Sequence, residues 1–419
     1  MNAARLAYTA LVHAALPFAR LRLAWRARRE PGYAEHISER FGRYAAEVPT
    51  APLIWIHAVS VGETRAAEPL VRALGERYPG HRILLTHMTP TGRRTGAALY
   101  GERGLRCYLP YDYPAAVGRF LDHFRPRLGL IMETEIWPNL IAGCVARGVP
   151  LYLVNARLSE KSFRGYRRIA RLARASLAGL SGIAAQSPRD AERFAALGAA
   201  NITVTGNLKF DVTPAAAQIE LGREWRAALG DRAVLLAAST RDGEEALLLD
   251  AFAELKAPRP LFLIVPRHLQ RFDEVARLIE SRGFTYARRS AGASAARDTE
   301  VMLGDSMGEM TAYYAACDVA FIGGSLGPFG GQNLIEACAV GKPVLIGPST
   351  YNFADAAEGA IEYGAAVRVQ TAEALMESAS HLLADAPARL TMGKRAIAFS
   401  RVHQGASGRV LKLVQLERK

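Results

Sequence analysis

The feature that most constrains the fold is a regular alternation of apolar, strand-like runs with helix-like segments. The runs of the first half are LIWIHAVS, RILLTHM, LRCYLP, LGLIME, LYLVNA, GIAAQ and ITVTG. Those of the second half are AVLLAAS, PLFLIVP, TYARR, EVMLG, DVAFIGG, KPVLIG and AAVRV. Strands that are buried on both faces and followed by crossover helices form parallel sheets. The pattern therefore predicts an α/β fold.

The length of the chain indicates two domains. Its 419 residues exceed what one hydrophobic core usually supports, and half of them are apolar. The periodicity lapses in DVTPAAAQIE, residues 211–220, which places a boundary there. We therefore expect two Rossmann-like, doubly wound parallel-sheet domains.

The cysteines predict neither a zinc site nor a disulfide framework. They lie far apart in the sequence and have no paired spacing; they are Cys107, Cys144, Cys317 and Cys338. We expect buried, reduced thiols of a cytosolic protein.

The formal net charge of +13 is concentrated in two clusters. The first consists of Arg20, Arg22, Arg26, Arg28 and Arg29. The second consists of Arg157, Lys161, Arg164, Arg167, Arg168, Arg171 and Arg174. Either cluster alone is typical of a solvated helix face, but two in one half of the chain indicate an anionic partner. Lipid headgroups or a phosphorylated substrate fit better than nucleic acid, because no nucleic-acid-binding motif accompanies the charge.

The N-terminal apolar stretch, residues 6–19, is interrupted by His13 and Pro17. It is shorter than the ~20 residues of a membrane-spanning helix. The arginines follow the stretch rather than precede it, which is unlike a signal peptide. Two interpretations stay open: a helix that lies on a membrane surface, or an ordinary helix packed on the domain.

Ligands of open parallel sheets bind beyond the carboxyl ends of the strands. In the second half these ends carry Arg267, a predicted helix-initiating Ser306 and the glycine-rich stretch GGSLGPFGGQNLIEA, residues 323–337. The glycines suit tight turns in a core, and they equally suit a phosphate on backbone N–H groups with a ribose on a carboxylate. No G-x-G-x-x-G, Walker A, zincin, G-x-S-x-G or Asp-x-Asp motif is present, so group transfer from a nucleotide-activated donor is the better hypothesis.

The first-half strand ends carry the candidate chemistry. The run WIHAVSVGE leads into Glu63 at a helix start, where pairing with the helix dipole is the alternative role. Glu133 and Glu135 are predicted to project to the same side of an extended backbone, and Lys209 is a candidate counter-charge. Asn155 adds a polar group, as does Arg157. A purely structural ion network is the alternative.

The motifs HAVSVGE, METEIWPNL, NARLS, TGNLKFD, VPRH, GDSMGEM and GGSLGPFGGQNLIEA followed by GKPVLIGP and NF resemble those of the 3-deoxy-D-manno-octulosonic acid (Kdo) transferases. These are inverting GT-B glycosyltransferases of lipopolysaccharide synthesis. The resemblance extends from ERFGRY to the C-terminal helix and implies two domains that face a central cleft. It also implies CMP-Kdo as donor and a lipid A precursor (lipid IVA) as acceptor. Action at the cytoplasmic face of the bacterial inner membrane follows, with peripheral or N-terminal anchoring.

The resemblance also implies a role for individual residues. Glu63 matches the proton acceptor, and Glu133 and Lys209 match the transition-state stabilisers. The CMP contacts match Pro266, Arg267, Met307, Gly308, Glu309, Asn333, Leu334, Ile335 and Glu336. Gln332 and Leu334 replace the usual His and Pro of the last motif. No metal and no other cofactor are expected.

The implied domains are a membrane-associating segment (residues 1–30), an acceptor-binding domain with the base (31–211) and a CMP-Kdo-binding domain (212–419). The C-terminal helix is expected to pack back on the first domain. Two other functions stay open: a GT-B transferase or epimerase that uses another nucleotide sugar, and a non-enzymatic membrane-surface binding protein. The presence of both Glu63 and Lys209 argues against the second, because a pure binding protein has no need of both.

Overall fold

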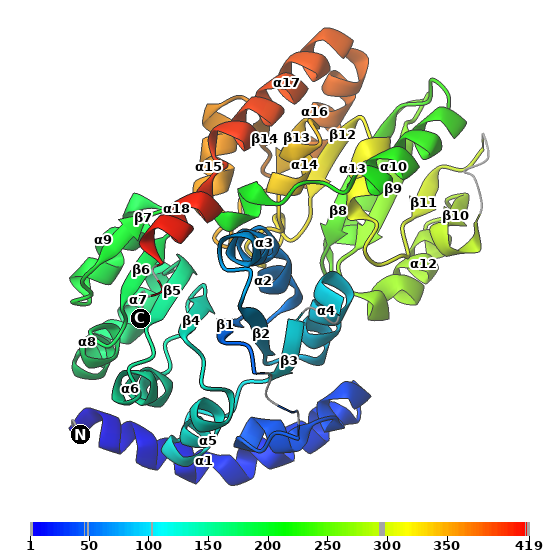
Figure 1. The fold of residues 1–419 in the computed structure, drawn as a ribbon. Coiled ribbons are helices and arrows are strands. Elements are labelled where there is room, and N and C mark those ends of the chain that lie inside the picture. The colour runs from blue at the N-terminus through cyan, green and yellow to red at the C-terminus, as the bar shows by residue number, and fades with distance from the viewer. Residues whose placement is uncertain are drawn as a thin grey trace. The chain divides into compact units, whose positions relative to one another are not determined.

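Two parallel sheets organise the chain in the computed structural model, which describes residues 3–45, 47, 50–101, 104–292, 298–414 and 416 (Figure 1). The chain divides into two units. Unit 1 comprises Met1–Val212 together with Gln404–Lys419, and unit 2 comprises Thr213–His403. Each unit contains one sheet of seven strands. This confirms the predicted α/β class with two doubly wound parallel-sheet domains.

The sheet of unit 1 has the strand order β3-β2-β1-β4-β5-β6-β7. Its strands are β1 (Leu53–His57), β2 (Arg82–His87), β3 (Gly104–Tyr108), β4 (Leu128–Met132), β5 (Leu151–Ala156), β6 (Gly182–Ala185) and β7 (Ile202–Val204). The helices are α1 (Ala3–Ala27), α2 (Val61–Ala66), α3 (Glu68–Arg77), α4 (Pro90–Tyr100), α5 (Pro114–Phe124), α6 (Pro138–Ala146), α7 (Glu160–Arg168), α8 (Ala170–Leu177), α9 (Pro188–Ala196) and α18 (Ala406–Leu413). Short 3₁₀ turns are η1 (Pro31–Ala34), η2 (Ile37–Phe41) and η4 (Leu208–Asp211).

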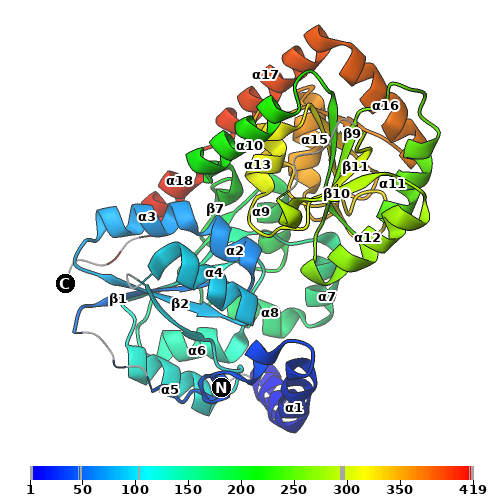
Figure 2. The ribbon, with the colours of Figure 1, turned by 90° about the vertical axis from the view of Figure 1, so that its right-hand side faces the viewer.

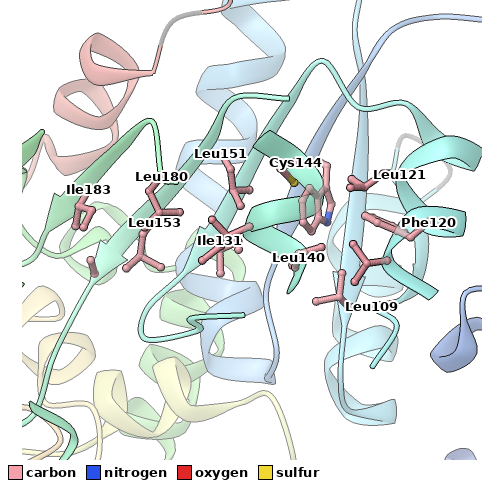
Figure 3. Close-up of a cluster of buried hydrophobic side chains, with 14 of the residues drawn as sticks. Leu109, Phe120, Leu121, Ile131, Leu140, Cys144, Leu151, Leu153, Leu180 and Ile183 are labelled. Carbon is pink, nitrogen blue, oxygen red and sulfur yellow. The ribbon is translucent and has the colours of Figure 1, made fainter. Parts of the chain in front are cut away.

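Alternate residues of β1 supply two different cores of unit 1. Leu53 and Trp55 belong to a cluster with side chains of α5, α6 and α9, part of which Figure 3 shows. Ile54 and Ile56 belong to a second cluster with α3 and α18. Successive side chains of a strand point to opposite faces of the sheet, so both faces of this sheet are covered. This explains why the sequence of β1 is almost continuously apolar and does not alternate between apolar and polar residues.

The sheet of unit 2 has the order β10-β11-β9-β8-β12-β13-β14. Its strands are β8 (Val234–Thr240), β9 (Leu261–Pro266), β10 (Tyr286–Arg288), β11 (Val301–Leu303), β12 (Val319–Ile322), β13 (Val344–Ile346) and β14 (Ala366–Arg368). The helices are α10 (Ala216–Ala228), α11 (Glu244–Ala253), α12 (Phe272–Ser281), α13 (Met310–Ala316), α14 (Ile335–Ala339), α15 (Ala354–Glu362), α16 (Ala372–Ala384) and α17 (Ala386–Val402), with 3₁₀ turns η5 (Leu269–Arg271) and η6 (Arg289–Ala291). Each apolar run identified in the sequence overlaps one strand of the two sheets.

Helix α1 lies against α6 and α8 of unit 1, at the edge of that unit seen end-on in Figure 2. Two hydrogen bonds hold its first half: Tyr8 Oη donates to Asp112 Oδ2 over 3.0 Å, and Thr9 Oγ1 donates to Asn139 Oδ1 over 3.0 Å. Within the described part of the chain, none of the helices is both long and apolar enough to cross a bilayer.

Candidate functional site

Glu63 is held at the start of α2 by a reciprocal cap. Ser60 is the N-cap residue, and its hydroxyl accepts the Glu63 backbone N–H and donates to Glu63 Oε1 over 3.0 Å. The backbone N–H of Val59 donates to Oε2 over 2.8 Å. The sequence SVGE thus forms a variant of the capping box, in which Ser and Glu three residues apart satisfy free N–H groups at a helix start. The structural role expected for Glu63 is therefore real, and it also fixes the carboxylate in one position.

The same carboxylate has an unusual proton affinity. Burial raises the pKa of Glu63 to about 8, and the negative charges of Glu133 and Glu135 act in the same direction. The hydrogen bonds from Val59 and Ser60 lower the pKa but do not offset the burial. A carboxylate with a pKa near the working pH is a far better proton acceptor than an ordinary glutamate.

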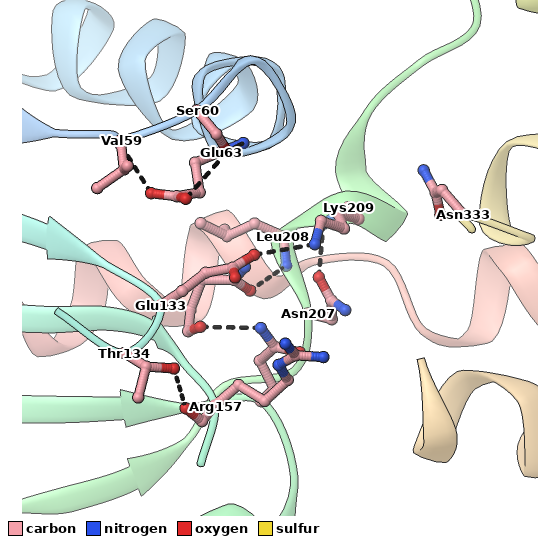
Figure 4. A network of polar contacts seen from close by, with 12 residues as sticks. Val59, Ser60, Glu63, Glu133, Thr134, Arg157, Asn207, Leu208, Lys209 and Asn333 are labelled. Carbon is pink, nitrogen blue, oxygen red and sulfur yellow. Dashed lines mark hydrogen bonds and ion pairs between the residues drawn. The ribbon is translucent and has the colours of Figure 1, made fainter. Parts of the chain in front are cut away.

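Glu133 and Lys209 form a half-buried ion pair with 2.9 Å between Lys209 Nζ and Glu133 Oε1 (Figure 4). Burial pushes the pKa of Glu133 upward, but the charge and hydrogen bond of Lys209, with Arg157 nearby, hold that pKa below its usual value. Glu133 is therefore ionised at neutral pH, whereas Glu63 titrates near pH 8. Such a difference between the pKa values of two neighbouring carboxyl groups is typical of acid–base sites.

The prediction that Glu133 and Glu135 extend to one side of a strand is wrong. Strand β4 ends at Met132, and Glu133 adopts a left-handed φ of +58°. The following residues form a turn that leads to α6, so the alternation of an extended chain does not apply. Burial raises the pKa of Glu135, while the indole of Trp137 lowers it. Positive φ is costly for a non-glycine residue, and such strain concentrates at functional sites.

The turn that carries Lys209 is fixed by polar side chains from distant parts of unit 1. Asn155, which is the penultimate residue of β5 and has a φ of +51°, accepts the backbone N–H of Leu208 over 2.9 Å through Oδ1. Asn207 accepts the Lys209 N–H over 3.0 Å. At the other end of the turn, the Asp211 carboxylate accepts the N–H groups of Gly405, Ala406 and Ser407 at the start of α18.

In unit 2 the residues expected to bind the nucleotide lie along one edge of the sheet. Parallel neighbours β11, β9, β8 and β12 end at this edge, so the segments after them are brought together. Pro266 is buried at the end of β9, and Arg267 directly after it is exposed. Burial raises the pKa of the Tyr314 phenol; the charge of Glu336 raises it further and that of Arg267 lowers it, which places both charges near one ring.

The glycine-rich loop after β12 has structural reasons for its glycines. A Cβ at Gly323 would lie 2.6 Å from the Cα of Thr240, and Gly324, Gly330 and Gly331 all have positive φ. The backbone N–H groups of Gly324 and Leu326 donate to the two carboxylate oxygens of the buried Glu244, over 2.5 and 3.0 Å. These two amides are engaged by Glu244, and the expectation that backbone N–H groups of the glycine turn bind a phosphate stays a prediction.

The segment after the glycines presents one polar pair and two buried side chains. Asn333 Nδ2 donates to Glu336 Oε1 over 3.0 Å, and Asn333 Oδ1 accepts the Ile335 N–H over 3.2 Å. The side chains of Leu334 and Ile335 are fully buried in unit 2. Any ligand contact of these two residues is therefore a backbone contact, and the core accommodates leucine in place of the proline that is usual in the motif it resembles.

The segment after β11 differs from the prediction. Helix α13 begins at Met310 with Glu309 as the N-cap, so Ser306 does not start it. Ser306 Oγ instead donates to Glu309 Oε2 over 2.5 Å, and Arg289 Nη2 lies 3.1 Å from Glu309 Oε1. Met307 and Gly308 are exposed, the latter with a φ of +87°. The stretch is a turn whose exposed part is available for a ligand and whose carboxylate is already paired.

The structure thus joins Glu63, Glu133 and Lys209 in unit 1, and Arg267 with Glu336 in unit 2. Sequence reasoning missed Glu244 and the capping role of Asp211. The signal for Glu244 was a glutamate pair at the start of the apolar run EEALLLDAF. Asp211 left no local signal, because the amides it accepts lie almost two hundred positions away in the sequence.

The four cysteines are buried and free, as predicted. Among the residues that the structure describes, no group of three or more His, Cys, Asp and Glu side chains is placed to hold a metal ion.

Comparison with known proteins decides the family. Residues 35–212 match the model of the 3-deoxy-D-manno-octulosonic-acid transferase (kdotransferase) family, and residues 246–399 match glycosyl transferases group 1. The 3-deoxy-D-manno-octulosonic acid transferase of Bordetella pertussis is 47% identical over 96% of this chain and 97% of its own length. The chain belongs to the Kdo transferase family. The enzyme of the same name from Haemophilus influenzae is 37% identical over 92% of both chains.

The family membership confirms the resemblance drawn from the motifs, and it makes the protein a glycosyltransferase of lipopolysaccharide synthesis. Among solved structures, UDP-GlcNAc 2-epimerase from Neisseria meningitidis is similar, with a TM-score of 0.59 over 86% of this chain and 99% of that one. Its 15% sequence identity reflects a shared fold and nothing more.

Proposed function

We propose that this enzyme transfers Kdo from CMP-Kdo to a lipid A precursor (lipid IVA) with inversion at the anomeric carbon. The observation that carries the proposal is the arrangement in unit 1: a fixed carboxylate with a pKa of about 8, beside a second carboxylate that is ionised and paired with a lysine. Membership of the Kdo transferase family supplies the sugar. Unit 1 then carries the acceptor and the base, and unit 2 binds the nucleotide of the donor.

Glu63 takes the proton of the acceptor hydroxyl. The hydroxyl oxygen forms a bond to the anomeric carbon as the bond from that carbon to the phosphate oxygen of CMP-Kdo breaks. The electron pair of the broken bond leaves with CMP, and the proton resides on a carboxyl oxygen of Glu63. General-base catalysis of this kind contributes typically ~10²–10⁴-fold to a rate.

The ion pair supports this step by holding a cation in place. Glu133 holds the ammonium group of Lys209 in place, so little free energy is spent on reorganising it during the reaction. The ammonium group can then stabilise either the negative charge that develops on the leaving phosphate or the carboxylate of Kdo. The turn that carries Lys209 is fixed by Asn155 and Asp211, which limits its movement. Preorganised charge of this sort is worth more than a flexible surface lysine.

In unit 2, Arg267 and the pair Asn333–Glu336 are the side chains that support CMP binding. An exposed guanidinium matches phosphate oxygens, and a carboxylate oriented by a neighbouring amide matches the hydroxyls of a ribose. The remaining proposed contacts are Pro266, Met307, Gly308 and Glu309, together with the backbone of Leu334 and Ile335. No metal has a part in the proposed mechanism.

Helix α1 supports an attachment of the enzyme to the anionic cytoplasmic face of the bacterial inner membrane. Leu11, Phe18, Leu21 and Trp25 are 71%, 71%, 68% and 54% exposed, and their spacing puts them on one side of the helix. The arginines in the second half of the helix suit lipid phosphates. An apolar face flanked by arginines is typical of a helix that lies in the membrane interface.

Product analysis tests the proposal. Purified enzyme is incubated with CMP-Kdo and a lipid A precursor, and the mass of the acceptor is measured by mass spectrometry. The expected result is an increment of one or more Kdo residues and release of CMP. A second measurement addresses the alternative nucleotide sugars: CMP is expected to raise the melting temperature and UDP is not. Stabilisation by UDP alone, with no Kdo transferred, contradicts the proposal.

A further inference from the structure

A cavity of about 570 Å³ lies between the C-terminal part of α1, the η1–η2 segment and α5, all within unit 1. Its walls are largely apolar; they include Leu23, Ala24, Ala27, Ile37 and Phe41. The volume falls in the ~300–1,000 Å³ range of pockets that enclose most of a small ligand. The residues proposed for catalysis are absent from its lining.

Three arginines and no carboxylate belong to the described lining: Arg20, Arg43 and Arg119. Arg119 Nη2 donates to the Phe41 carbonyl over 2.7 Å, which holds its guanidinium beside the cavity. Arg20 lies over the Phe41 ring at 4.8 Å. The cavity therefore combines an apolar interior with an excess of positive charge.

Arg43 is placed beside the cavity by the backbone rather than by a salt bridge. Gly42 ends η2 with a φ of +75°, and a Cβ at this position would lie 2.6 Å from the Ala116 carbonyl oxygen of α5. The Arg43 N–H then donates to the Ser38 carbonyl over 3.0 Å. Only glycine allows this turn so close to α5, and the turn leaves the Arg43 side chain exposed.

The mouth of the cavity adjoins the exposed apolar face of α1. Ala24 lines the cavity and is exposed, and Leu21 of the apolar face lies three residues before it, so the two are neighbours on the helix surface. Trp25 follows Ala24 directly. An apolar chain that lies against this face of α1 is therefore next to the lining of the cavity.

We propose that this cavity is a binding site for one acyl chain of an anionic phospholipid, whose phosphate lies among Arg20, Arg43 and Arg119. The apolar walls match the chain, and the three guanidinium groups match the headgroup. A small phosphate compound leaves the walls uncovered, and a neutral lipid leaves the arginines without a counter-charge. The site goes beyond the transfer reaction, and it does not depend on the catalytic residues.

Short-chain lipids below their micelle concentration test the site without a bilayer. Isothermal titration of the full-length enzyme is carried out with dihexanoyl phosphatidylglycerol, dihexanoyl phosphatidylcholine and glycerol 3-phosphate. Phosphatidylglycerol is expected to bind at least about tenfold more tightly than either of the others. Phosphatidylcholine lacks the net negative charge that the arginines would bind, and glycerol 3-phosphate lacks the acyl chain that the cavity would bury. Equal binding of the two lipids overturns the anionic part of the proposal. Equal binding of glycerol 3-phosphate makes the site an anion site without a chain.

Two variants locate the binding. Ala27→Phe fills the cavity, and about a tenfold loss of phosphatidylglycerol affinity is expected. The matched control is Ala14→Phe, which enlarges an exposed residue of the same helix away from the cavity and is expected to bind like the parent. Arg43→Gln alters only an exposed side chain and is expected to reduce the preference for phosphatidylglycerol over phosphatidylcholine. Unchanged binding in folded Ala27→Phe, or an unchanged preference in Arg43→Gln, overturns the proposal.

The same lipid titration separates this site from the membrane attachment. Replacing Phe18 and Leu21 by serine removes apolar side chains of the exposed face and leaves the cavity lining intact. This double variant is expected to bind monomeric phosphatidylglycerol normally even if it no longer binds vesicles. Failure of vesicle binding with intact lipid binding therefore counts against the attachment alone.

Discussion

At the scale of single residues, environment separates two glutamates of identical chemistry. Glu63 is half-buried with hydrogen-bond donors but no cation in its cap, and its pKa rises to about 8. Glu133 is as buried, yet the lysine 2.9 Å away lowers its pKa. The first therefore exchanges a proton near neutral pH, and the second keeps its charge and holds Lys209.

Glu63→Gln distinguishes the base from the cap. The amide keeps the shape of the side chain and loses its basicity, so we expect a folded protein with normal CMP-Kdo binding and a turnover reduced roughly 10²–10⁴-fold. If Glu63 only caps α2, stability falls by ~0.3–1 kcal/mol and turnover stays near normal. Single-turnover Kdo transfer measures the difference. Transfer above about a tenth of the parent rate contradicts the assignment and leaves Glu133 as the next candidate.

The raised pKa of Glu63 also predicts the pH dependence of the parent enzyme. A base acts when it is deprotonated, and the fraction of ionised Glu63 grows as the pH rises through about 8. We therefore expect kcat/KM for the acceptor to rise across this range on an acid limb with a midpoint near 8. A profile measured from pH 6 to 9.5 provides the test. A midpoint near the ordinary glutamate value excludes Glu63 as the group observed.

Glu336→Gln tests the proposed nucleotide site in unit 2. Asn333 holds the Glu336 carboxylate, and replacing its charge weakens a charge-assisted hydrogen bond to CMP by roughly 1–3 kcal/mol. Titration calorimetry with CMP measures the change, and thermal unfolding verifies the fold. Glu358→Gln, a carboxylate of unit 2 that pairs with Arg368, is a matched control expected to bind CMP normally. Unchanged affinity in Glu336→Gln removes this residue from the site.

At the scale of elements, the strands could be predicted from the sequence and the turns between them could not. Continuous apolar runs identify strands buried on both faces, and this pattern is local. The left-handed Glu133 and the start of α13 depend on contacts with other elements, so an extended backbone at Glu133 and a cap at Ser306 were both wrong. The occupied amides of the glycine loop required knowledge of Glu244, which lies about eighty residues earlier.

The turn η4 offers a prediction at this scale, because Asp211 joins it to α18. Asp211→Ala removes the acceptor of the amides of Gly405 and Ser407, both at 2.6 Å, and a lost N-cap costs about 0.5–2 kcal/mol. We expect lower stability and, because Lys209 shares the turn, lower kcat. Asp385→Ala removes the N-cap of α17 in unit 2 and serves as the control, with a similar stability loss and a normal kcat. Equal kcat values for the two variants contradict a role for η4 in holding Lys209.

At the scale of the whole molecule, each unit has its own sheet and its own share of the proposed chemistry. The C-terminal segment Gln404–Lys419 belongs to unit 1, so the chain returns to the unit in which it began. The alternation of runs and the length of the chain predicted two such sheets. The identity of the sugar could be predicted only through the motifs, because nothing in apolar periodicity distinguishes one nucleotide-sugar enzyme from another.

The proposed membrane attachment is best tested on the exposed face of α1 rather than by truncation. Deleting residues 1–18 also removes Tyr8 and Thr9, which bond to Asp112 and Asn139, so such a variant is expected to lose stability as well as apolar surface. The double replacement Phe18→Ser with Leu21→Ser leaves those bonds intact.

Burial of each of these side chains in a bilayer is worth ~1.5–3 kcal/mol, so we expect about a hundredfold or greater loss of affinity for vesicles that contain phosphatidylglycerol. Co-sedimentation measures it, and salt is expected to release more of the parent protein as the arginines are screened. If the double variant sediments with vesicles as fully as the parent, the exposed face of α1 does not hold the enzyme on the membrane.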